Sequence, residues 1–342
     1  MYHPRLYGSF YDMGFKYGSL LFQKNIQFPA IPAENIEFGA QCYQEVQQFY
    51  PDLMPEFQGF AKGWQVDEAR LGAFVSGLGV FDTTGKCSVF AYRNQDSVIF
   101  GRNYDMLFEF KKLTESCLIA PAEKFAYISQ SDVFIGRCDG INEQGLAIAL
   151  SFVNGTTIQP GVTFHFVIRK VLETCKNVDE AIAVIQSAKV ASANNFLIAD
   201  ATGNIAVVET APQSSTVRYP PASDNFICIT NQFETANMAP FDQGGIDWCQ
   251  PQERYRRLYD CLEATSQMDL SKAKTILSDS SICLDLKSEK FGTIWSIVAN
   301  LNELNIERAE GKPKVKNYQP EPRLAWWLKK RGSAKTKKAK LV

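Results

Sequence analysis

The sequence is poor in histidine, in paired cysteines and in long apolar runs. Its 342 residues include only two histidines, His3 and His165, so little material exists for a histidine-rich metal site or a cysteine–histidine pair. The nine cysteines form no CxxC pair and are odd in number, which argues against a zinc knuckle and a complete disulfide framework. No run reaches the roughly 18 apolar residues of a membrane helix, and the first residues lack a secretory pattern. We expect reduced thiols, no metal or organic cofactor, and a cytoplasmic location.

The chain also lacks a strong charge of either sign. Lys and Arg number 36 against 37 Asp and Glu, for a net charge of −1. No overall field therefore draws the protein to nucleic acid or to an acidic membrane, and a small molecule or peptide is the better default partner. The basic end KKRGSAKTKKAKLV is the exception. We expect it to be a disordered tail, with a nucleic-acid or membrane arm as the alternative.

The sequence does contain a helical front followed by a β-rich centre. Residues 34–80 repeat apolar positions near helical spacing, and Asp67 is placed to cap a third helix there. Short β-like runs follow from residue 87: SVFAY, VIFGRN, GLAIALSFV, TFHFVIRK, NNFLIAD, NIAVVET and FICITN. Turn-forming residues predict three hairpins, at 93–96, 142–145 and 200–204. Runs of strands followed by helices favour an α+β protein with antiparallel sheets.

Three more helices and one more hairpin are expected in the second half. NVDEAIAVIQSAK is amphipathic, with Asn177 or Asp179 as its start. ERYRRLYDCLEAT and DLSKAKTILSDS supply two further helices, and TIWSIVANLNELNIERAEGKP has the pattern of a hairpin.

Cys87 differs from the other eight cysteines in its position. It opens the first strand of the β-rich region, directly after the turn-forming residues Thr-Thr-Gly-Lys. The other eight are most simply small buried hydrophobic residues. His165 lies inside a strand-like run and His3 near the start of the chain, so a catalytic thiol at position 87 needs another base. An α-amine titrates at about 7.7 to 8.0, so a free amine on Cys87 itself would be available near neutral pH.

That amine exists only if the chain is cut between Lys86 and Cys87. The same thiol can make the cut by attacking the preceding carbonyl, in an N-to-S acyl shift that is followed by hydrolysis of the thioester. A strained turn lowers the barrier to this step. Residues 1–86 would then be a propeptide-like chain.

Several segments, taken in order, carry a family resemblance. They are Cys87 at a strand start, the hairpin ending GRNYD, and the segments DGINEQGLAIALSFVNG, NNFLIADATGNIAVVET and CITNQF. Together they resemble the N-terminal-nucleophile (Ntn) amide hydrolases of the choloylglycine hydrolase group, which act on linear C–N bonds. The front segment GSFYDMGFKYGSLL resembles the leader of the self-cleaving acyl-CoA:6-aminopenicillanate acyltransferase-like branch.

The resemblance implies a role for individual residues. Cys87 matches the nucleophile, and Arg102 and Asp105 match an Arg-x-x-Asp beside it, with the aspartate holding the α-amine and the arginine supplying positive charge near the thiolate. Asn231 matches the side-chain donor of an oxyanion hole, and Arg254 matches a second active-site arginine. Taken singly, these residues have plainer interpretations: an ion pair at a strand end, a turn residue and a solvated helix face.

Two positions depart from the family pattern. Lys86 stands where the acyltransferase branch has glycine, which leaves the efficiency of self-cleavage open. Where bile-salt hydrolases carry an asparagine, this chain has Ser151 and Phe152, which we expect to contact the substrate. Bile salts are therefore not the first expected substrate.

The resemblance implies a four-layer αββα sandwich of two antiparallel sheets. We expect residues 1–86 to form a helical leader, 87–325 the catalytic domain and 326–342 the basic tail. The expected reaction is acyl transfer from a linear, non-peptide amide, with a thioester as the alternative donor, through a Cys87 acyl-enzyme to water or to an amine. The expected partner is a small-molecule amide or acyl donor, with no nucleic acid or membrane, and a homo-oligomer stays open. The alternative is an uncleaved, catalytically inactive binding protein of the same fold.

Overall fold

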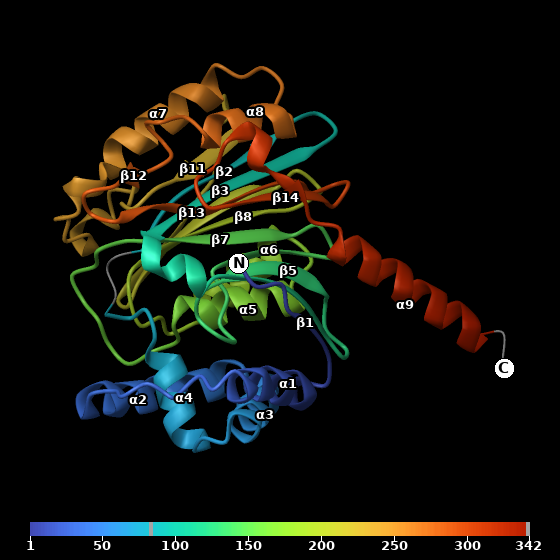
Figure 1. Cartoon of the computed structure of the whole chain (residues 1–342). Coiled ribbons are helices and arrows are strands. Elements are labelled where there is room, and N and C mark those ends of the chain that lie inside the picture. The colour runs from blue at the N-terminus through green and yellow to red at the C-terminus, as the bar shows by residue number, and fades with distance from the viewer. Residues whose placement is uncertain (82–84, 340–342) are drawn as a thin grey trace.

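Two β-sheets lie face to face between two layers of helices (Figure 1). This computed structural model describes residues 1–81 and 85–339. One sheet, sheet A, has the order β1 (Arg5–Gly8), β4 (Glu115–Pro121), β5 (Tyr127–Ser131), β6 (Asp139–Asn142), β7 (Ala147–Phe152), β8 (Asn194–Ala199), β9 (Ile205–Ala211) and β10 (Ser214–Arg218). Its pairs are antiparallel except β1 with β4.

The second sheet, sheet B, carries Cys87. Its order is β11 (Phe226–Ile229), β2 (Lys86–Arg93), β3 (Val98–Leu107), β13 (Phe291–Asn300), β14 (Asn305–Glu310) and β15 (Gln319–Pro320), with β12 (Asp285–Leu286) paired to β13. Every pair in sheet B is antiparallel. Strand β2 also contacts β7 and β8 of sheet A, so the strand that carries Cys87 lies where the two sheets meet.

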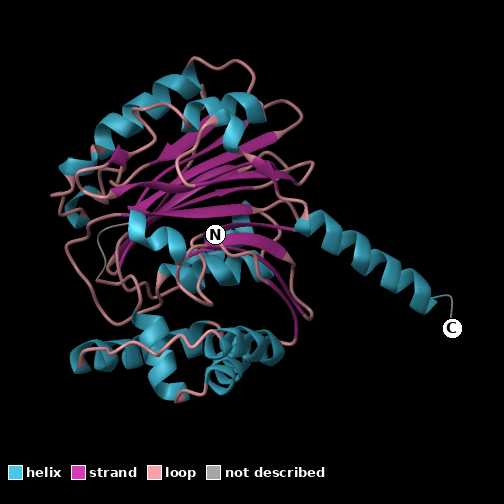
Figure 2. Cartoon of the chain, viewed as in Figure 1, coloured by secondary structure: helices cyan, strands magenta, loops and turns pink. Residues whose placement is uncertain are grey.

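Helices cover the outer face of each sheet. The pair α5 (Phe164–Thr174) and α6 (Val178–Gln186) packs on sheet A, and the pair α7 (Pro251–Glu263) and α8 (Leu270–Leu277) packs on sheet B. Figure 2 shows the resulting order of helix, sheet, sheet and helix. The α+β architecture of two antiparallel sheets expected from the sequence is confirmed.

Four leader helices pack below α5 (Figure 1): α1 (Phe10–Gln23), α2 (Ala33–Phe49), α3 (Met54–Trp64) and α4 (Glu68–Gly77). The expected cap of the third helical segment is present, because the Asp67 side chain accepts the Arg70 backbone N–H at 2.8 Å. Helices α1 and α3 cross closely through glycines. A Cβ on Gly14 would lie 2.1 Å from the Glu56 carbonyl oxygen, and one on Gly59 would lie 2.1 Å from that of Tyr11.

Local signals located most of the other elements. The hairpins β2–β3, β6–β7, β8–β9 and β13–β14 form where the turn residues predicted them. The helix expected from residue 177 or 179 is α6, and Asn177 caps it by accepting the Glu180 backbone N–H. The two helices expected later are α7 and α8. The strands that were not expected are β1, β4, β5, β10, β12 and β15.

The run TFHFVIRK was wrongly predicted to be a strand. It forms the start of α5, with Thr163 as the N-cap residue. Nearly every side chain of this helix is buried, and its apolar stripe, which includes Phe164, Val167 and Val171, becomes clear only over the whole helix. The first residues, Thr-Phe-His-Phe, alternate polar and apolar side chains as a strand does. His165 therefore lies on helix α5, which packs on sheet A, and not on a strand.

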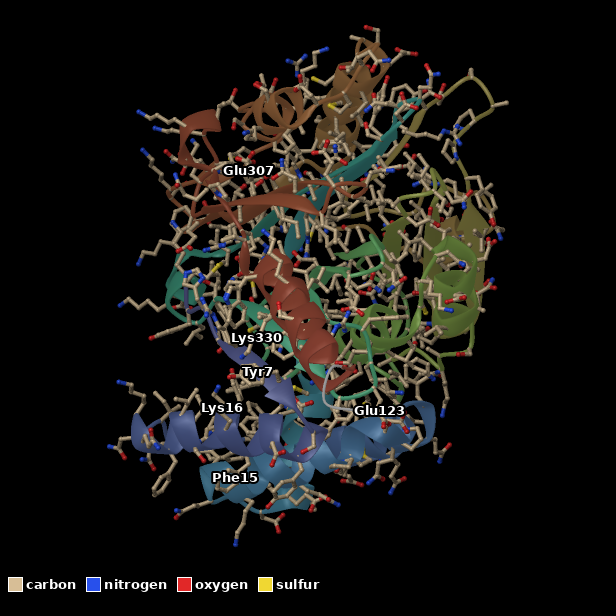
Figure 3. The ribbon with its side chains drawn as sticks, turned by 90° about the vertical axis from the view of Figure 1, so that its right-hand side faces the viewer. Tyr7, Phe15, Lys16, Glu123, Glu307 and Lys330 are labelled. Atoms are coloured by element: carbon tan, nitrogen blue, oxygen red, sulfur yellow. The ribbon has the colours of Figure 1, made fainter. Side chains whose placement is uncertain are left out.

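The basic end of the chain also differs from its prediction. Helix α9 (Arg323–Ala339) covers most of the segment 326–342 that was expected to be disordered, and residues 340–342 lie outside the described part. Its beginning is packed on the body: Leu324 is buried, and Trp327 lies 5.1 Å from the Tyr7 ring. Figure 3 shows Lys330 near Tyr7, and its ammonium lies 5.2 Å from that ring. Aromatic and cation–π contacts therefore support the first turns of this helix.

Three further observations concern the cysteines, the helices and the possible metal ligands. All nine cysteines are free thiols, as expected. Over residues 1–81 and 85–339, no helix is both long enough and apolar enough to span a bilayer. Within the same ranges, no group of three or more His, Cys, Asp or Glu side chains is arranged to hold a metal ion.

Candidate active site

Cys87 lies near the start of β2 and is 1% exposed. The antiparallel register pairs it with Tyr104 on β3, and pairs Lys86 with Asp105. Because β2 and β3 form one tight hairpin, Arg102 and Asp105 are brought beside Cys87 by local pairing alone. Of the expected turn before Cys87, Thr83 and Thr84 lie outside the described residues.

Arg102 connects the thiol to sheet A. Its Nη2 donates to Cys87 Sγ at 3.2 Å, and its Nη1 donates to Asp139 Oδ2 at 2.5 Å and to the Cys138 carbonyl at 2.7 Å. Arg102 and Asp139 are both fully buried. A guanidinium held by a carboxylate in this way presents a fixed positive charge to the sulfur, which favours the thiolate.

Asn231 and Arg254 hold the backbone of the same residue. The Cys87 N–H donates to Asn231 Oδ1 at 3.2 Å, and Arg254 Nη2 donates to the same oxygen at 2.7 Å. Arg254 Nη1 donates to the Cys87 carbonyl at 2.7 Å and to Ser88 Oγ at 2.9 Å. Two donors therefore fix the amide oxygen of Asn231 toward Cys87. Its Nδ2, the expected oxyanion donor, donates to the Phe152 carbonyl at 2.8 Å in this uncut chain.

Asp105 is buried with one oxygen in use. Its Oδ1 accepts from Thr293 Oγ1 at 2.5 Å, whereas no described hydrogen bond reaches Oδ2, which lies 3.8 Å from Arg254 Nη1. Burial raises the pKa of this carboxyl to about 6, against the opposing effect of Arg254. The carboxylate is therefore charged at neutral pH and has an oxygen able to accept another donor.

The thiol itself is held neutral in the uncut chain. Burial raises the pKa of Cys87, and the positive charge and hydrogen bond of Arg102 oppose that effect. Asp105 raises the pKa further and Arg254 lowers it. Since burial has the largest influence, this arrangement needs a nearby base or more access to water before the sulfur becomes nucleophilic.

Lys86, the residue before Cys87, is fully buried. Its ammonium lies 5.4 Å from the ring centroid of Phe152 and 5.4 Å from that of Trp248. Of the two predicted substrate contacts, Phe152 therefore lies beside the residue that precedes Cys87. Ser151 is also buried, and its hydroxyl donates to the Thr230 carbonyl.

Neither histidine has a described contact with Cys87. His3 lies at the surface, where its Nε2 is 3.0 Å from Glu310 Oε1. His165 packs against the Phe164 ring, and burial lowers its pKa to about 3, so it is neutral. A histidine base for the thiol is therefore excluded within the described residues.

Three residues of the site were not predicted. Asp139 anchors Arg102, Trp295 Nε1 donates to Asp139 Oδ2 at 3.2 Å, and Thr293 binds Asp105. Asp139 lies in the quoted DGINEQG segment, so its position carried a signal. Thr293 and Trp295 lie on β13, almost two hundred residues along the chain from β3, and only the pairing of these strands brings them to the site.

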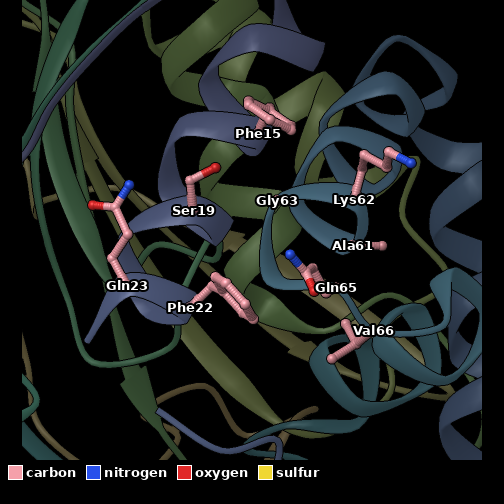
Figure 4. Close-up of a pocket in the computed structure, with 9 residues that line it drawn as sticks. All are labelled: Phe15, Ser19, Phe22, Gln23, Ala61, Lys62, Gly63, Gln65 and Val66. Carbon is pink, nitrogen blue, oxygen red and sulfur yellow. The ribbon is translucent and has the colours of Figure 1, made fainter. Parts of the chain in front are cut away.

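The two described surface pockets lie away from this cluster. The larger one, of about 600 Å³, lies between α1 and α3, where Phe15, Phe22 and Lys62 are among its lining residues (Figure 4). The other lies beside Asp179 and Tyr219. Neither includes a residue of the cluster around Cys87, whose side chains are buried in the uncut chain.

Solved structures with the same fold support the architecture. Two variants of conjugated bile acid hydrolase from Clostridium perfringens align with TM-scores of 0.50. One is 16% identical, with 66% of this chain and 89% of that chain covered; the other is 14% identical, with 69% and 96% covered. Penicillin V acylase from Agrobacterium tumefaciens aligns with a TM-score of 0.45, at 15% identity over 66% of this chain and 83% of that chain. The four-layer αββα Ntn-hydrolase fold expected from the sequence is confirmed by the two bile acid hydrolase structures.

The sequence comparisons assign the family. No curated protein sequence matches this chain. The family model of acyl-coenzyme A:6-aminopenicillanic acid acyl-transferase matches residues 92–315. This match begins after Cys87, so it does not by itself identify the nucleophile. It spans well over half of the chain, and the protein therefore belongs to the acyl-coenzyme A:6-aminopenicillanic acid acyl-transferase family.

Proposed function

We propose that this protein is a self-activating cysteine Ntn hydrolase or acyltransferase that acts on a linear, non-peptide amide. The observation that carries the proposal is that buried polar side chains bind Cys87 both at its sulfur and at its backbone. Arg102 contacts its sulfur, while Asn231 and Arg254 contact its backbone N–H and carbonyl. A structural cysteine needs no charged partner on its thiol, so a buried guanidinium that contacts the sulfur supports a chemical role.

The first step is a cut between Lys86 and Cys87. The thiol attacks the Lys86 carbonyl carbon, the C–N bond breaks, and the Cys87 nitrogen takes up the proton, which leaves a thioester and a free α-amine. Water then cleaves the thioester and gives a Lys86 carboxylate and a free thiol. The Asn231 oxygen that accepts the Cys87 N–H in the uncut chain is placed to accept from the new amine.

In the second step the α-amine of Cys87 takes the thiol proton, and the thiolate attacks the amide carbonyl of the substrate. The proton then passes to the departing amine, and water or another amine releases the acyl group from sulfur. Asp105 supports this role of the amine, since its Oδ2 is buried, charged at neutral pH and open to a further donor. Arg102 stabilises the thiolate by its charge. The Nδ2 group of Asn231 would serve the oxyanion after turning from the Phe152 carbonyl.

Intact-mass spectrometry of the purified wild-type chain beside a Cys87→Ala variant tests the first step. We expect two wild-type chains, one ending at Lys86 and one beginning at Cys87, and a single uncut variant chain. Turnover of linear acyl p-nitroanilides by the cut protein tests the second step. A wild-type chain that stays whole while folded would falsify self-activation.

A second candidate function is an uncut binding protein of the same fold. It is favoured by Lys86 in place of the glycine expected for the family branch, and by the 1% exposure of Cys87. In this case no α-amine forms and the thiol keeps its raised pKa. The state of the bond between Lys86 and Cys87 separates the two candidates in the same mass experiment.

A further inference from the structure

A buried lysine next to the nucleophile is the least expected feature of the site. A fully buried ammonium needs compensation, and two of the groups around Lys86 are aromatic rings, each with its centroid 5.4 Å from Nζ. Phe152 comes from the end of β7 in sheet A, and Trp248 comes from the short 3-10 helix Asp247–Cys249 before α7. Two separate parts of the chain therefore converge on one ammonium.

The surroundings of the ammonium add a negative charge. Asp105 is the register partner of Lys86, and the lysine's positive charge lowers the pKa of that carboxyl against the opposing effect of burial. The Trp248 ring packs edge-on against the Phe291 ring, with 5.0 Å between the ring centroids. Trp248 is 47% exposed to water. The group of Phe152, Trp248 and Asp105, here called the ammonium box, is thus fixed on its inner side and reaches solvent on its outer side.

The role of Lys86 in the proposed self-cleavage relates the ammonium box to substrate binding. In self-cleavage, Lys86 is the acyl residue: its carbonyl carbon becomes bonded to Cys87 Sγ. In turnover, the carbonyl carbon of the substrate becomes bonded to the same sulfur. Once the cut chain end withdraws, the groups that enclosed the lysine side chain border the place where a substrate acyl group attaches.

We propose that the ammonium box is the acyl-specificity site of this protein and takes acyl groups that carry a primary ammonium at the distance of a lysine side chain. This rests on the proposed function, since it assumes that Cys87 forms the acyl-enzyme. The box selects such groups because ring faces attract a desolvated cation and Asp105 supplies opposite charge. An uncharged acyl chain of equal length gains only apolar contact there.

A matched pair of substrates tests the selectivity on the cut wild-type protein. The ε-aminocaproyl p-nitroanilide repeats the lysine stem and its ammonium, and heptanoyl p-nitroanilide replaces the ammonium by a methyl group. We expect kcat/KM to favour the ammonium substrate by about tenfold or more, and the Trp248→Leu variant to lose most of that preference. If the heptanoyl amide is hydrolysed as fast as the ammonium substrate or faster, the proposed role of the ammonium box is wrong, whereas the amide hydrolase function is retained.

A binding experiment tests the box without any turnover. In the uncut Cys87→Ala background, Lys86→Gly removes the lysine stem and its ammonium, and n-butylammonium has the same length and charge as the lost group. We expect n-butylammonium chloride to raise the Tm of this double variant, more than 1-butanol does and more than it raises the Tm of the parent with Lys86 in place. Adding Trp248→Leu should remove the effect. If Lys86→Gly does not fold, Lys86→Ala with propylammonium makes the same comparison. Equal response to the amine and the alcohol refutes the box, even if the protein hydrolyses no amide at all.

Discussion

Two buried arginines show how the same side chain serves two different ends in this molecule. Arg169 on α5 binds Glu56 of the leader through two guanidinium nitrogens, binds Glu173 at 2.8 Å, and donates to the Ile135 carbonyl at 2.9 Å. Glu173 in turn accepts from Tyr50 at 2.5 Å. This cluster joins the leader to the body, and each guanidinium nitrogen has a partner.

Arg102 is equally buried but less completely bonded. It has one carboxylate partner, Asp139, and its other described acceptors are two carbonyls and the Cys87 sulfur. Its Nε has no described partner, and neither has Asp105 Oδ2 nearby. A network with every group bonded is rigid, whereas one with spare capacity can accept a new donor, acceptor or charge during a reaction. We therefore interpret the Arg169 cluster as structural, and the Arg102 cluster as part of the proposed active site.

The largest expected effect is on the structural side. Arg169→Met leaves Glu56 and Glu173 buried without a cation, so we expect the free energy of unfolding to fall by about 3–5 kcal/mol in a denaturant titration. Because no described contact joins Arg169 to Cys87, the variant chain that still folds should be cut as fully as the wild type. If the free energy of unfolding falls by less than about 1 kcal/mol, or if the folded variant stays uncut, the purely structural role of Arg169 is wrong.

On the chemical side, Asn231→Ala should lower kcat by about 10²–10³ with a smaller change in KM, because a positioned amide donor is worth about 3–4 kcal/mol at a developing oxyanion. The rate of p-nitroanilide hydrolysis by cut protein measures this. The matched control is Asn237→Ala, which removes an exposed amide that contacts Thr216. If Asn231→Ala keeps the wild-type kcat, Asn231 does not stabilise the oxyanion.

Asp105 gives a pH-dependent prediction. Burial raises the pKa of its carboxyl from 3.8 to about 6, so the folded chain binds the proton more tightly than the unfolded chain does. The resulting stabilisation is fully present below about pH 4 and is lost as the pH rises through 6, where the buried charge costs up to about 3 kcal/mol. In the uncut Cys87→Ala background, Asp105→Asn should raise Tm at pH 8, with no gain at pH 4. Thermal melts across that range check this, and a gain that does not change with pH contradicts it.

The smallest expected effect lies at the leader's glycine crossing. Gly59→Ala places a Cβ 2.1 Å from the Tyr11 carbonyl oxygen, so the helices must move apart, at a cost of about 1–3 kcal/mol. Gly332→Ala on α9 is the control, since a Cβ there meets nothing within 4 Å and alanine favours a helix by up to about 1 kcal/mol. In denaturant titrations, the free energy of unfolding should therefore fall for Gly59→Ala and rise for Gly332→Ala. Equal changes would show that the crossing is looser than its geometry indicates.

Local signals predicted the hairpin that carries Cys87, Arg102 and Asp105, whereas the roles of these residues were implied by the family resemblance. The turn after β2 sets the register with β3, and this register alone brings Arg102 and Asp105 beside Cys87. Asn231 and Arg254 were named only through the family resemblance, because they lie on separate segments more than 140 residues beyond Cys87. The predicted donor group of Asn231 is turned to the Phe152 carbonyl, a detail that depends on which groups surround it.

Prediction from the pattern failed in two helices. In α5 the helical stripe of apolar residues extends to Leu172, whereas the run that was read ends at Lys170 and begins with strand-like alternation. In α9 the basic composition indicated a solvated tail, whereas Trp327 and Lys330 pack on Tyr7. The first error arises from reading too short a window, and the second from contacts with a distant segment that no local window contains.

The sequence by itself determined the helical front, the turns of four hairpins, the caps of α4 and α6, and the placement of a cysteine at the start of a strand. These depend on backbone preferences and on neighbours a few residues away. Only the tertiary structure decided that Asp139 would anchor Arg102, that Thr293 would bind Asp105, and that Lys86 would be buried between Phe152 and Trp248. Those contacts join segments that meet only when two sheets stack, because stacking, and not local propensity, sets which side chains share the interior.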